Sequence, residues 1–442
     1  MARRRSHVRH FIGILVLAGA LAAPASAMAS GWVYVESNNP DRNQNSVLAL
    51  RYADNGRIKP AEIREFPTRG TGAAYIRDQS VGTLAGDQQV TLSRDGKWLF
   101  AVNQGSGTIA VFRVNGRTGA LRHVKGSPFN SGGNAPISVG FNGRHLVVAN
   151  HGVVAPFVPA PGADFGSPNF TSFSVSRSGR LRRISSVPAG PGPTQALIAP
   201  NGRNVLSTSF YGFAGPANQT IQSLTLSRRG RLAEAPGSPT GFPASMTDGV
   251  MLPPFLPPGI EKLAFGIATH PTGNFAYILG PANLRVAIYR VNGRTGELTF
   301  TGQEDNPGGV AACWIVLTSD GRYAFAANTF TQDISVFRVS RSGGDLTFLR
   351  KVPVPSTGTV FNIAIDPTNR FLYVQAGHAD PDGPRPQEVN PDGSVKSTPV
   401  PADGNFLESF RIRSGGRLRS IGTVALPVPS SDIPMGAQVL QK

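Results

Sequence analysis

Cysteine is almost absent from this chain of 442 residues, because Cys313 is the only one. A single cysteine cannot form an intrachain disulfide, so packing and hydrogen bonds must hold the fold together. Cys313 stands in the apolar segment AACWIVL, and no histidine lies beside it in the sequence to activate the thiol. This context favours a buried structural thiol over a nucleophile.

Acidic residues are also scarce, since Asp and Glu number 26 against 43 Lys and Arg, which gives a formal charge of +17 at pH 7. Arg3, Arg4, Arg5 and Arg9 carry four of these charges, so the rest of the chain keeps 17 − 4 = +13. Many basic residues recur in the hairpin between the third and fourth strands of a repeat described below. They are Arg113, Arg117 and Arg122; Arg177, Arg180, Arg182 and Arg183; Arg228, Arg229 and Arg231; Arg338 and Arg341; Arg411, Arg413, Arg417 and Arg419.

This recurrence predicts a basic rim, for which two interpretations stay open. The charges can keep the turns in solution and deter pairing at exposed outer strands. Alternatively they attract anionic polymers of the cell envelope. No nucleic-acid-binding motif is present, and nucleic acid is not an expected partner.

A hydrophobic run long enough to span a membrane is lacking at the N-terminus, where Phe11 to Ala23 is apolar but short. Basic residues precede this run and Ala25-Ser26-Ala27 follows it, which is the pattern of a cleaved signal peptide over residues 1–27. We therefore expect an exported protein that is secreted or associated with the cell envelope, soluble after cleavage and not membrane-spanning. Its route stays open between the general secretory and twin-arginine pathways, although the residues around the arginines match the latter poorly.

The chain is rich in Gly (52) and Pro (37) and is built on a repeat whose least interrupted copy runs from Val90 to Pro128. Short alternating runs around the turn residues Asp95-Gly96 and the turn NGRTG at 115–119 predict four antiparallel strands. A unit of this size cannot bury both faces of its sheet alone. Repetition therefore implies that copies pack face to face.

Six innermost strands are found from the turn that follows each of them. They are Gln88–Ser93, Ile137–Phe141, Gln195–Ala199, Phe265–His270, Cys313–Thr318 and Phe361–Asp366. A seventh unit is split, since Met435 to Leu440 resembles an inner strand without a partner and Trp32 to Glu36 a second strand without an inner one. Joining the two removes a free sheet edge. The sequence thus predicts an all-β fold, a seven-bladed β-propeller of four-stranded antiparallel blades, as a single domain over residues 28–442.

Extra length falls in only two of the four connections of each unit. The insertions are Gly70–Gly86, His151–Asn169, Tyr211–Asn218, Gly237–Ile260 and Gly377–Asn405. In an up-and-down blade these two connections emerge on the same side of the ring. We expect the insertions to surround one mouth, where binding loops on a rigid scaffold usually lie.

The strand motifs SRDGKWLFAVN, TIAVFRVNGRTGAL, HPTGNFAYILG and TSDGRYAFAAN resemble those of the lactonase-type seven-bladed propellers, which include 6-phosphogluconolactonases and carboxymuconate-lactonizing enzymes. The resemblance implies lactone chemistry at the mouth, carried by a His, an Arg and a Glu. Aligned by the turns, these positions fall on Thr194, Phe265 and Pro281, which cannot transfer protons or hold a carboxylate. His270 leads into a short turn on the opposite face and is expected to be structural.

Polar residues at the strand ends are the remaining candidates for a site. Amides that could bind a hydroxyl-rich ligand, or simply cap strand ends, are Asn103, Gln104, Asn150, Gln195, Asn328, Asn362, Gln375 and Gln438. Candidate catalytic groups are Asp87, His151, Glu261 and His378. Asp380, Asp382 and Asp392 resemble part of a calcium loop, but a proline interrupts it and no bidentate Glu follows at the right spacing. Ca2+ is the only cofactor considered, and none is predicted.

Two classes of function follow from this pattern. The replaced His, Arg and Glu positions and the export signal favour a scaffold that binds a small polar ligand, a glycan or a protein at the mouth. The alternative is a hydrolase of lactones, similar to 6-phosphogluconolactonase, or of other small esters, which uses different mouth residues.

Overall fold

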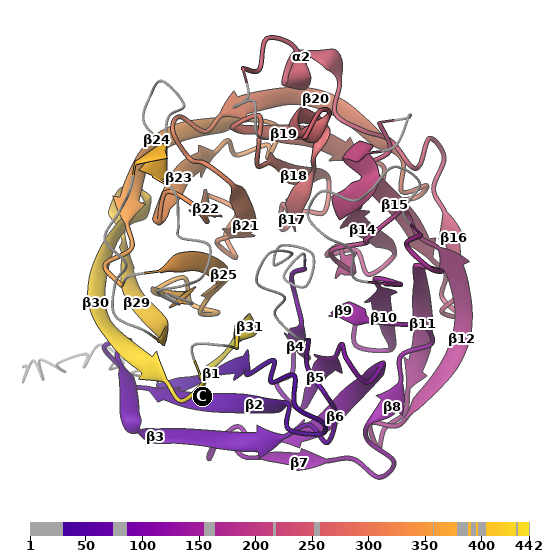
Figure 1. Cartoon of the computed structure of the whole chain (residues 1–442), viewed down its shortest axis with the longest axis vertical. Coiled ribbons are helices and arrows are strands. Elements are labelled where there is room, and N and C mark those ends of the chain that lie inside the picture. Colours follow the sequence, from indigo (N-terminus) through magenta and orange to yellow (C-terminus); the bar gives the residue numbers. More distant parts are fainter. Residues whose placement is uncertain are drawn as a thin grey trace, which may run out of the picture.

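The computed structural model describes residues 30–73, 86–153, 164–214, 218–251, 257–356, 358–377, 404–429 and 432–441, and the backbone of 388–389 and 395–396. These residues form a ring of seven antiparallel sheets (Figure 1). The predicted seven-bladed propeller is confirmed. The predicted signal peptide lies outside the described residues, so its cleavage stays a prediction.

The blades are numbered in chain order. Blade 1 holds β4 (Val90–Leu92), β5 (Trp98–Asn103), β6 (Thr108–Val114) and β7 (Leu121–His123), with β8 (Phe129–Asn130) also on β6. Blade 2 holds β9 (Pro136–Phe141), β10 (His145–Asn150), β11 (Asn169–Val175) and β12 (Leu181–Pro188). Blade 3 holds β13 (Leu197–Ile198), β14 (Asn204–Thr208), β15 (Ile221–Leu226) and β16 (Leu232–Glu234). Blade 4 holds β17 (Phe265–Thr269), β18 (Phe275–Gly280), β19 (Arg285–Val291) and β20 (Leu298–Asp305).

Blade 5 holds β21 (Ala312–Leu317), β22 (Tyr323–Asn328), β23 (Asp333–Val339) and β24 (Leu346–Pro353). Blade 6 holds β25 (Thr359–Ile365), β26 (Phe371–Gly377), β29 (Asn405–Arg413) and β30 (Arg417–Leu426). Blade 7 holds β31 (Met435–Gln441), β1 (Gly31–Glu36), β2 (Ser46–Tyr52) and β3 (Ile58–Pro67). The short elements are η2 (Phe210–Ala214), α2 (Ala244–Thr247), η3 (Ile260–Lys262), η4 (Ser414–Gly416), and the ribbon of β27 (Glu388–Val389) and β28 (Val395–Lys396).

Blade 7 closes the ring with strands from both ends of the chain, as the split repeat predicts. Trp32 faces Leu440 and Val33 faces Val439 in an antiparallel register. The β1 strand, which would otherwise present an open edge, therefore has β2 on one side and β31 on the other.

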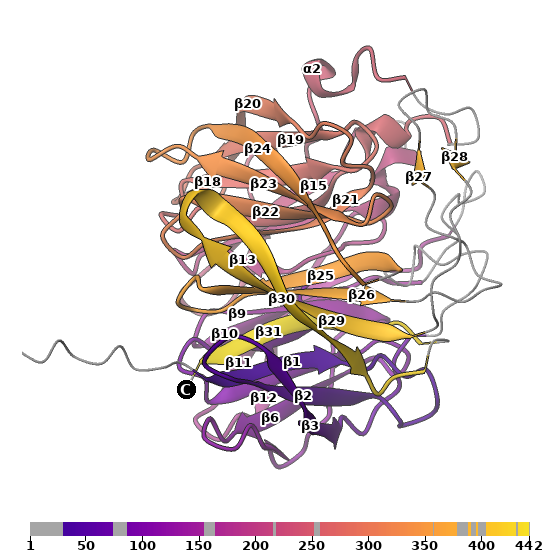
Figure 2. The same cartoon turned by 90° about the vertical axis from the view of Figure 1, so that its left-hand side faces the viewer.

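The two sides of the ring differ, because antiparallel strands place alternate connections on opposite sides. We call the side with the short turns after the first and third strands of each blade the turn face, and the other side the mouth. Figure 2 shows the ribbon of β27 and β28 on the side where β26 ends and β29 begins, which is the mouth.

Several expected strands differ from the observed ones, and the inner strand of blade 1 is only Val90–Leu92, shorter than Gln88–Ser93. The inner strand of blade 3 is only Leu197–Ile198, shorter than Gln195–Ala199, because the backbone N–H groups of Gln195 and Ala196 donate to the hydroxyls of Ser207 (3.4 Å) and Ser138 (3.0 Å). The outer strand of blade 1 ends at His123, and β8 then continues the edge by pairing with Thr108 and Ile109.

The core of the propeller lies between adjacent blades. One such cluster joins Trp32 and Val47 of blade 7 to Leu99 and Phe112 of blade 1, all of which are buried. At the same junction the turn residue Gly119 has φ +68°, and a Cβ built on it would lie 2.2 Å from Trp32 Cδ2. The turn accepts only glycine there, because both the backbone conformation and the close approach exclude a side chain.

Cys313 is partly buried against the largest of these core clusters. Burial raises the pKa of its thiol to about 12, so the thiolate is not available near neutral pH. No helix in the described ranges is long and apolar enough to cross a membrane.

Candidate functional site

The segment that leads into β4 reaches the axis of the ring and places the Asp87 carboxyl group there. Asn362 Nδ2 of β25 donates to Asp87 Oδ1 at 3.1 Å, and Gln195 Nε2, which precedes β13, donates to Oδ2 at 3.4 Å. The backbone N–H of Gln88 also donates to Oδ1, at 2.7 Å. Asp87 thus joins residues from blades 3 and 6, which are separated on both sides of the ring.

Further hydrogen bonds tie this segment to the other blades. Trp314 Nε1 of blade 5 donates to the carbonyl of Gly86 at 3.1 Å. The Gln195 side chain accepts from the backbone N–H of Ile267 of blade 4 at 3.0 Å, and Asn362 Oδ1 accepts from Gly436 of blade 7 at 2.8 Å. The segment is therefore held rigidly, and the position of the carboxyl group depends on the closed ring.

The surroundings of Asp87 favour its neutral form. Burial raises the pKa of the Asp87 carboxyl to about 6, and the hydrogen bonds from Gln88 and Asn362 only partly oppose this effect. No ion pair to Asp87 occurs within the described ranges. A carboxyl group with a pKa of about 6 can accept and return a proton near neutral pH.

Two amides next to this group lack partners. Gln89 is 2% exposed, and neither its Nε2 nor its Oε1 forms a hydrogen bond to a described residue. Gln88 Oε1 is buried as well, and no residue in the described ranges donates to it. Buried amides normally find hydrogen bonds, so these atoms provide donors and acceptors for a water or a polar ligand.

An arc of aromatic rings runs from η2 in blade 3 along the inner strands of blades 4, 5 and 6. Phe210 contacts Phe265 with a centroid distance of 5.9 Å, Phe265 contacts Trp314 at 5.7 Å, and Trp314 contacts Phe361 at 5.7 Å. All four rings are at least 97% buried. The arc gives the axial site an apolar wall.

The residues at the positions where the resemblance implies a His, an Arg and a Glu are all buried. Phe265 is one of the rings of the arc, Thr194 is buried with its hydroxyl 2.5 Å from that of Thr208, and Pro281 is buried. The arc itself was not predicted. The available signal was the recurrence of Phe265, Trp314 and Phe361 at similar places in three inner strands.

His151 lies at the end of β10 and is fully buried. Its Nδ1 contacts the carbonyl of Val153 at 3.1 Å and must therefore carry the proton, which leaves Nε2 as an acceptor without a described partner. Burial lowers the pKa of His151 to about 4. The ring meets Tyr211 edge to face at 5.7 Å, so His151 is a neutral imidazole beside the loops of blade 3.

Three of the candidate amides are engaged with other polar side chains, Asn150 and Asn328 inside their own blades and Asn103 across the junction with blade 7. Asn103 accepts from Asn45 at 2.9 Å, Asn150 donates to Asn169 at 3.0 Å, and Asn328 donates to Ser335 at 2.8 Å. Each joins the end of a second strand to neighbouring polar groups, which is the capping role considered for these residues.

The other candidates are dispersed. The Gln104 Nε2 atom and the Gln375 Oε1 atom are buried without a partner among the described residues, whereas Gln375 Nε2 donates to the carbonyl of Pro434. Gln438 is partly buried in β31, and Glu261 is partly buried in η3 with no described side-chain hydrogen bond. His378, Asp380, Asp382 and Asp392 lie outside the described residues. Among the residues that the structure does describe, no group of three His, Cys, Asp or Glu side chains could hold a metal ion.

The chain is similar to known proteins in both sequence and structure. The family model described as "Lactonase, 7-bladed beta-propeller" matches residues 76–133 and 266–381. The 6-phosphogluconolactonase of Bacillus subtilis is 23% identical over 65% of this chain and 76% of its own length. That of Formosa agariphila is 20% identical over 71% of this chain and 84% of its own.

Among solved structures, the periplasmic gluconolactonase of Pseudomonas aeruginosa superposes with a TM-score of 0.62 at 17% identity, covering 92% of this chain and 99% of the other. At this identity the likeness concerns the fold. Together with the family match, it confirms the resemblance to the lactonase-type seven-bladed β-propellers.

Proposed function

We propose that this lactonase-type propeller hydrolyses a small lactone at the axial site, with Asp87 as the general base. The observation that carries the proposal is a carboxyl group on the axis whose pKa is raised to about 6 and which only amide donors hold in place. The similarity to 6-phosphogluconolactonases over most of their length supports the same class of reaction.

The reaction needs few groups from the protein. Asp87 takes a proton from a water molecule as the water oxygen attacks the carbonyl carbon of the lactone. The Gln89 amide, which lacks a described partner, is the proposed donor to the oxygen that becomes negative. When the ring C–O bond breaks, Asp87 returns the proton to the leaving alkoxide, and the product is a hydroxy acid.

The proposed substrate carries no phosphate close to its reacting carbonyl. No basic side chain contacts Asp87 or Gln195 in the described ranges, and an ionised Asp87 would repel a phosphate group. The buried aromatic arc makes the surroundings of this segment apolar, which favours an uncharged sugar-derived or alkyl lactone over a charged one. This feature separates the proposal from the activity named for the Bacillus subtilis relative.

The test compares hydrolysis of glucono-δ-lactone, an alkyl δ-lactone and 6-phosphogluconolactone by the purified chain, after subtraction of spontaneous hydrolysis. Asp87→Asn is expected to lower kcat/KM for the neutral lactones by about 100-fold or more, the usual scale for loss of a general base. Glu261→Gln is the matched control, since this carboxyl group is partly buried elsewhere on the mouth side, and it should retain activity. Full activity of the Asp87→Asn protein would refute the role of Asp87.

The second candidate function is a binding scaffold, favoured by the replacement of the expected His, Arg and Glu with buried Thr194, Phe265 and Pro281. Calorimetry with the same lactones and their hydroxy acids separates the two candidates. Saturable binding without turnover by the unmodified chain would support the scaffold and overturn the hydrolase.

A further inference from the structure

The positive charge of this chain is concentrated in one part of the ring. Residues 97–233 contain 14 Lys and Arg and a single acid, Asp164, for a net charge of 14 − 1 = +13. The four arginines before residue 10 contribute +4 to the total of +17, so all other residues together sum to 17 − 13 − 4 = 0. Residues 97–233 run from the residue before β5 of blade 1 into β16 of blade 3, and these three blades are neighbours in the ring (Figure 1).

These basic side chains are all exposed. They lie in the turns after the inner and third strands, along the outer strands, or next to them. The set, called the basic sector below, is Lys97, Arg113, Arg117, Arg122, Lys125, Arg144, Arg177, Arg180, Arg182, Arg183, Arg203, Arg228, Arg229 and Arg231. Within the described ranges only Lys97 forms an ion pair, with Asp95 at 3.0 Å.

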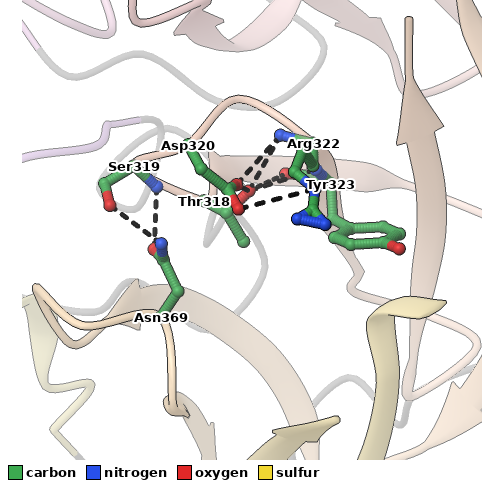
Figure 3. A network of polar contacts seen from close by, with 6 residues as sticks. All are labelled: Thr318, Ser319, Asp320, Arg322, Tyr323 and Asn369. Carbon is green, nitrogen blue, oxygen red and sulfur yellow. Dashed lines mark hydrogen bonds and ion pairs between the residues drawn. The ribbon is translucent and has the colours of Figure 1, made fainter. Parts of the chain in front are cut away.

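One turn position shows how blades 2 and 3 differ from blade 5, while blade 1 keeps an acid there in Asp95. In blade 5 the turn after the inner strand contains Asp320, whose carboxylate lies 3.7 Å from the guanidinium of Arg322 (Figure 3). In blades 2 and 3 the equivalent residues are Asn142 and Asn201. Arg144 and Arg203 therefore have no acid in their own turns.

The turns of the sector are rigid and linked to one another. Asn142 Nδ2 of blade 2 donates to the carbonyl of Gly202 of blade 3 at 2.9 Å, and Ser172 Oγ donates to the carbonyl of Gly230 at 2.6 Å. A similar link joins blades 5 and 6, where Asn369 bonds twice to Ser319 (Figure 3). The arginines are thus displayed on a fixed surface, which lowers the entropy cost of binding.

The need to deter pairing at exposed outer strands does not explain why the positive charge is concentrated in this sector. Every blade has an outer strand, but the residues before 97 and after 233, apart from the four N-terminal arginines, sum to zero. A positively charged surface over three adjacent blades is instead typical of a protein that attracts a polyanion.

We propose that the basic sector binds a linear acidic polysaccharide. Guanidinium groups pair with carboxylates in a two-pronged geometry, and the exposed hydroxyls of Ser176, Ser178 and Ser227 between the arginines can bond to sugar hydroxyls. The sector follows the curved edge of the ring as well as the turn face, so a flexible chain can follow it. Large exposed hydrophobic side chains in the described ranges are Val153, Met251 and Phe330, none of which lies in these turns or on the outer strands, so nothing there would enter a lipid layer.

The experiment measures binding of the purified full chain to polygalacturonate as a function of NaCl concentration. The test variant replaces Arg144, Arg203, Arg228, Arg229 and Arg231 by Gln. The control variant replaces Arg290, Arg294, Arg338, Arg341 and Arg413 by Gln, which removes the same charge from exposed positions in blades 4 to 6. Thermal melting of both proteins checks that they are folded.

We expect the test variant to bind at least about 30-fold more weakly with a shallower salt dependence, and the control variant to stay within about threefold of the unmodified chain. Equal losses in the two variants would show that only total charge matters and would overturn the proposal. Tighter binding to duplex DNA, or to vesicles containing an anionic phospholipid, than to polygalacturonate at the same salt concentration would overturn it as well. These outcomes are independent of lactone hydrolysis at the axial site.

Discussion

The Asn362 amide donates to the Asp87 carboxylate at 3.1 Å although the two residues are 275 positions apart in the chain. The contact joins the start of blade 1 to the inner strand of blade 6 across the centre of the ring. It holds a partly buried carboxyl group without any cation beside it, which has consequences for stability as well as for chemistry.

Asp87 should make the fold less stable as the pH rises. The pKa of Asp87 is raised to about 6 in the folded protein from 3.8 in the unfolded chain. Between about pH 4 and pH 6 the unfolded chain therefore loses this proton while the folded protein keeps it, and the free energy of unfolding falls. The free energy of unfolding should have fallen by about 1–3 kcal/mol at pH 7. Urea unfolding from pH 4.5 to 7 should therefore show a flatter pH dependence for Asp87→Asn, whereas the exposed control Asp41→Asn should follow the unmodified protein. Parallel curves for all three would contradict the raised pKa.

His151 should have the opposite effect. Its pKa is lowered to about 4, so stability is present above about pH 6.5 and is lost as the pH falls toward 4, when the unfolded chain takes up a proton that the folded one does not. Nitrogen-15 NMR of the imidazole should show a neutral ring protonated at Nδ1 at pH 6. A charged ring at that pH would show that the site is more solvated than its burial implies.

Removal of residues 435–442 should unfold the whole domain rather than a single blade. The deletion takes away β31 and exposes the edge of β1 from Gly31 to Glu36 in the interior of the ring. We expect loss of several kcal/mol or failure to fold, measured by circular dichroism and thermal melting. Deletion of Lys442 alone is the control. An unchanged melting temperature after the longer deletion would argue against closure by β31.

Gly119→Ala tests the packing between blades 7 and 1. The added Cβ would lie 2.2 Å from Trp32 Cδ2 at φ +68°, so the variant suffers both a clash and backbone strain, at about 2–4 kcal/mol. Gly143→Ala is the matched control in another turn, with φ +94° and no atom within 4 Å, and should cost about 1 kcal/mol. Chemical denaturation measures the free energy of unfolding of both variants. Equal losses of stability would show that backbone strain alone acts at Gly119 and that the contact with Trp32 costs nothing.

The blades could be predicted because their signals are local. Alternating runs around Asp95-Gly96 or Asp320-Gly321 specify a hairpin through neighbouring residues, and the half-units at Trp32 and Met435 specify the closure because each lacks the strand that the other supplies. The sequence marks Asp87, Gln195 and Asn362 as polar candidates near strand ends, but it does not show that they form one network. Asn328 looked equivalent to them, yet Asp333 and Ser335 in its own blade already use its amide.

The sequence by itself therefore determined the seven-bladed architecture and the net charge, since periodicity, turn residues and composition are properties of the chain. Only the tertiary structure decided that Asp87 reaches the axis, that Phe265 and Trp314 form a wall beside it, and that the arginines of three blades share one surface. The physical reason is that closing the ring brings residues up to hundreds of positions apart into contact. It also sets the desolvation that shifts the pKa of Asp87 and His151 in opposite directions.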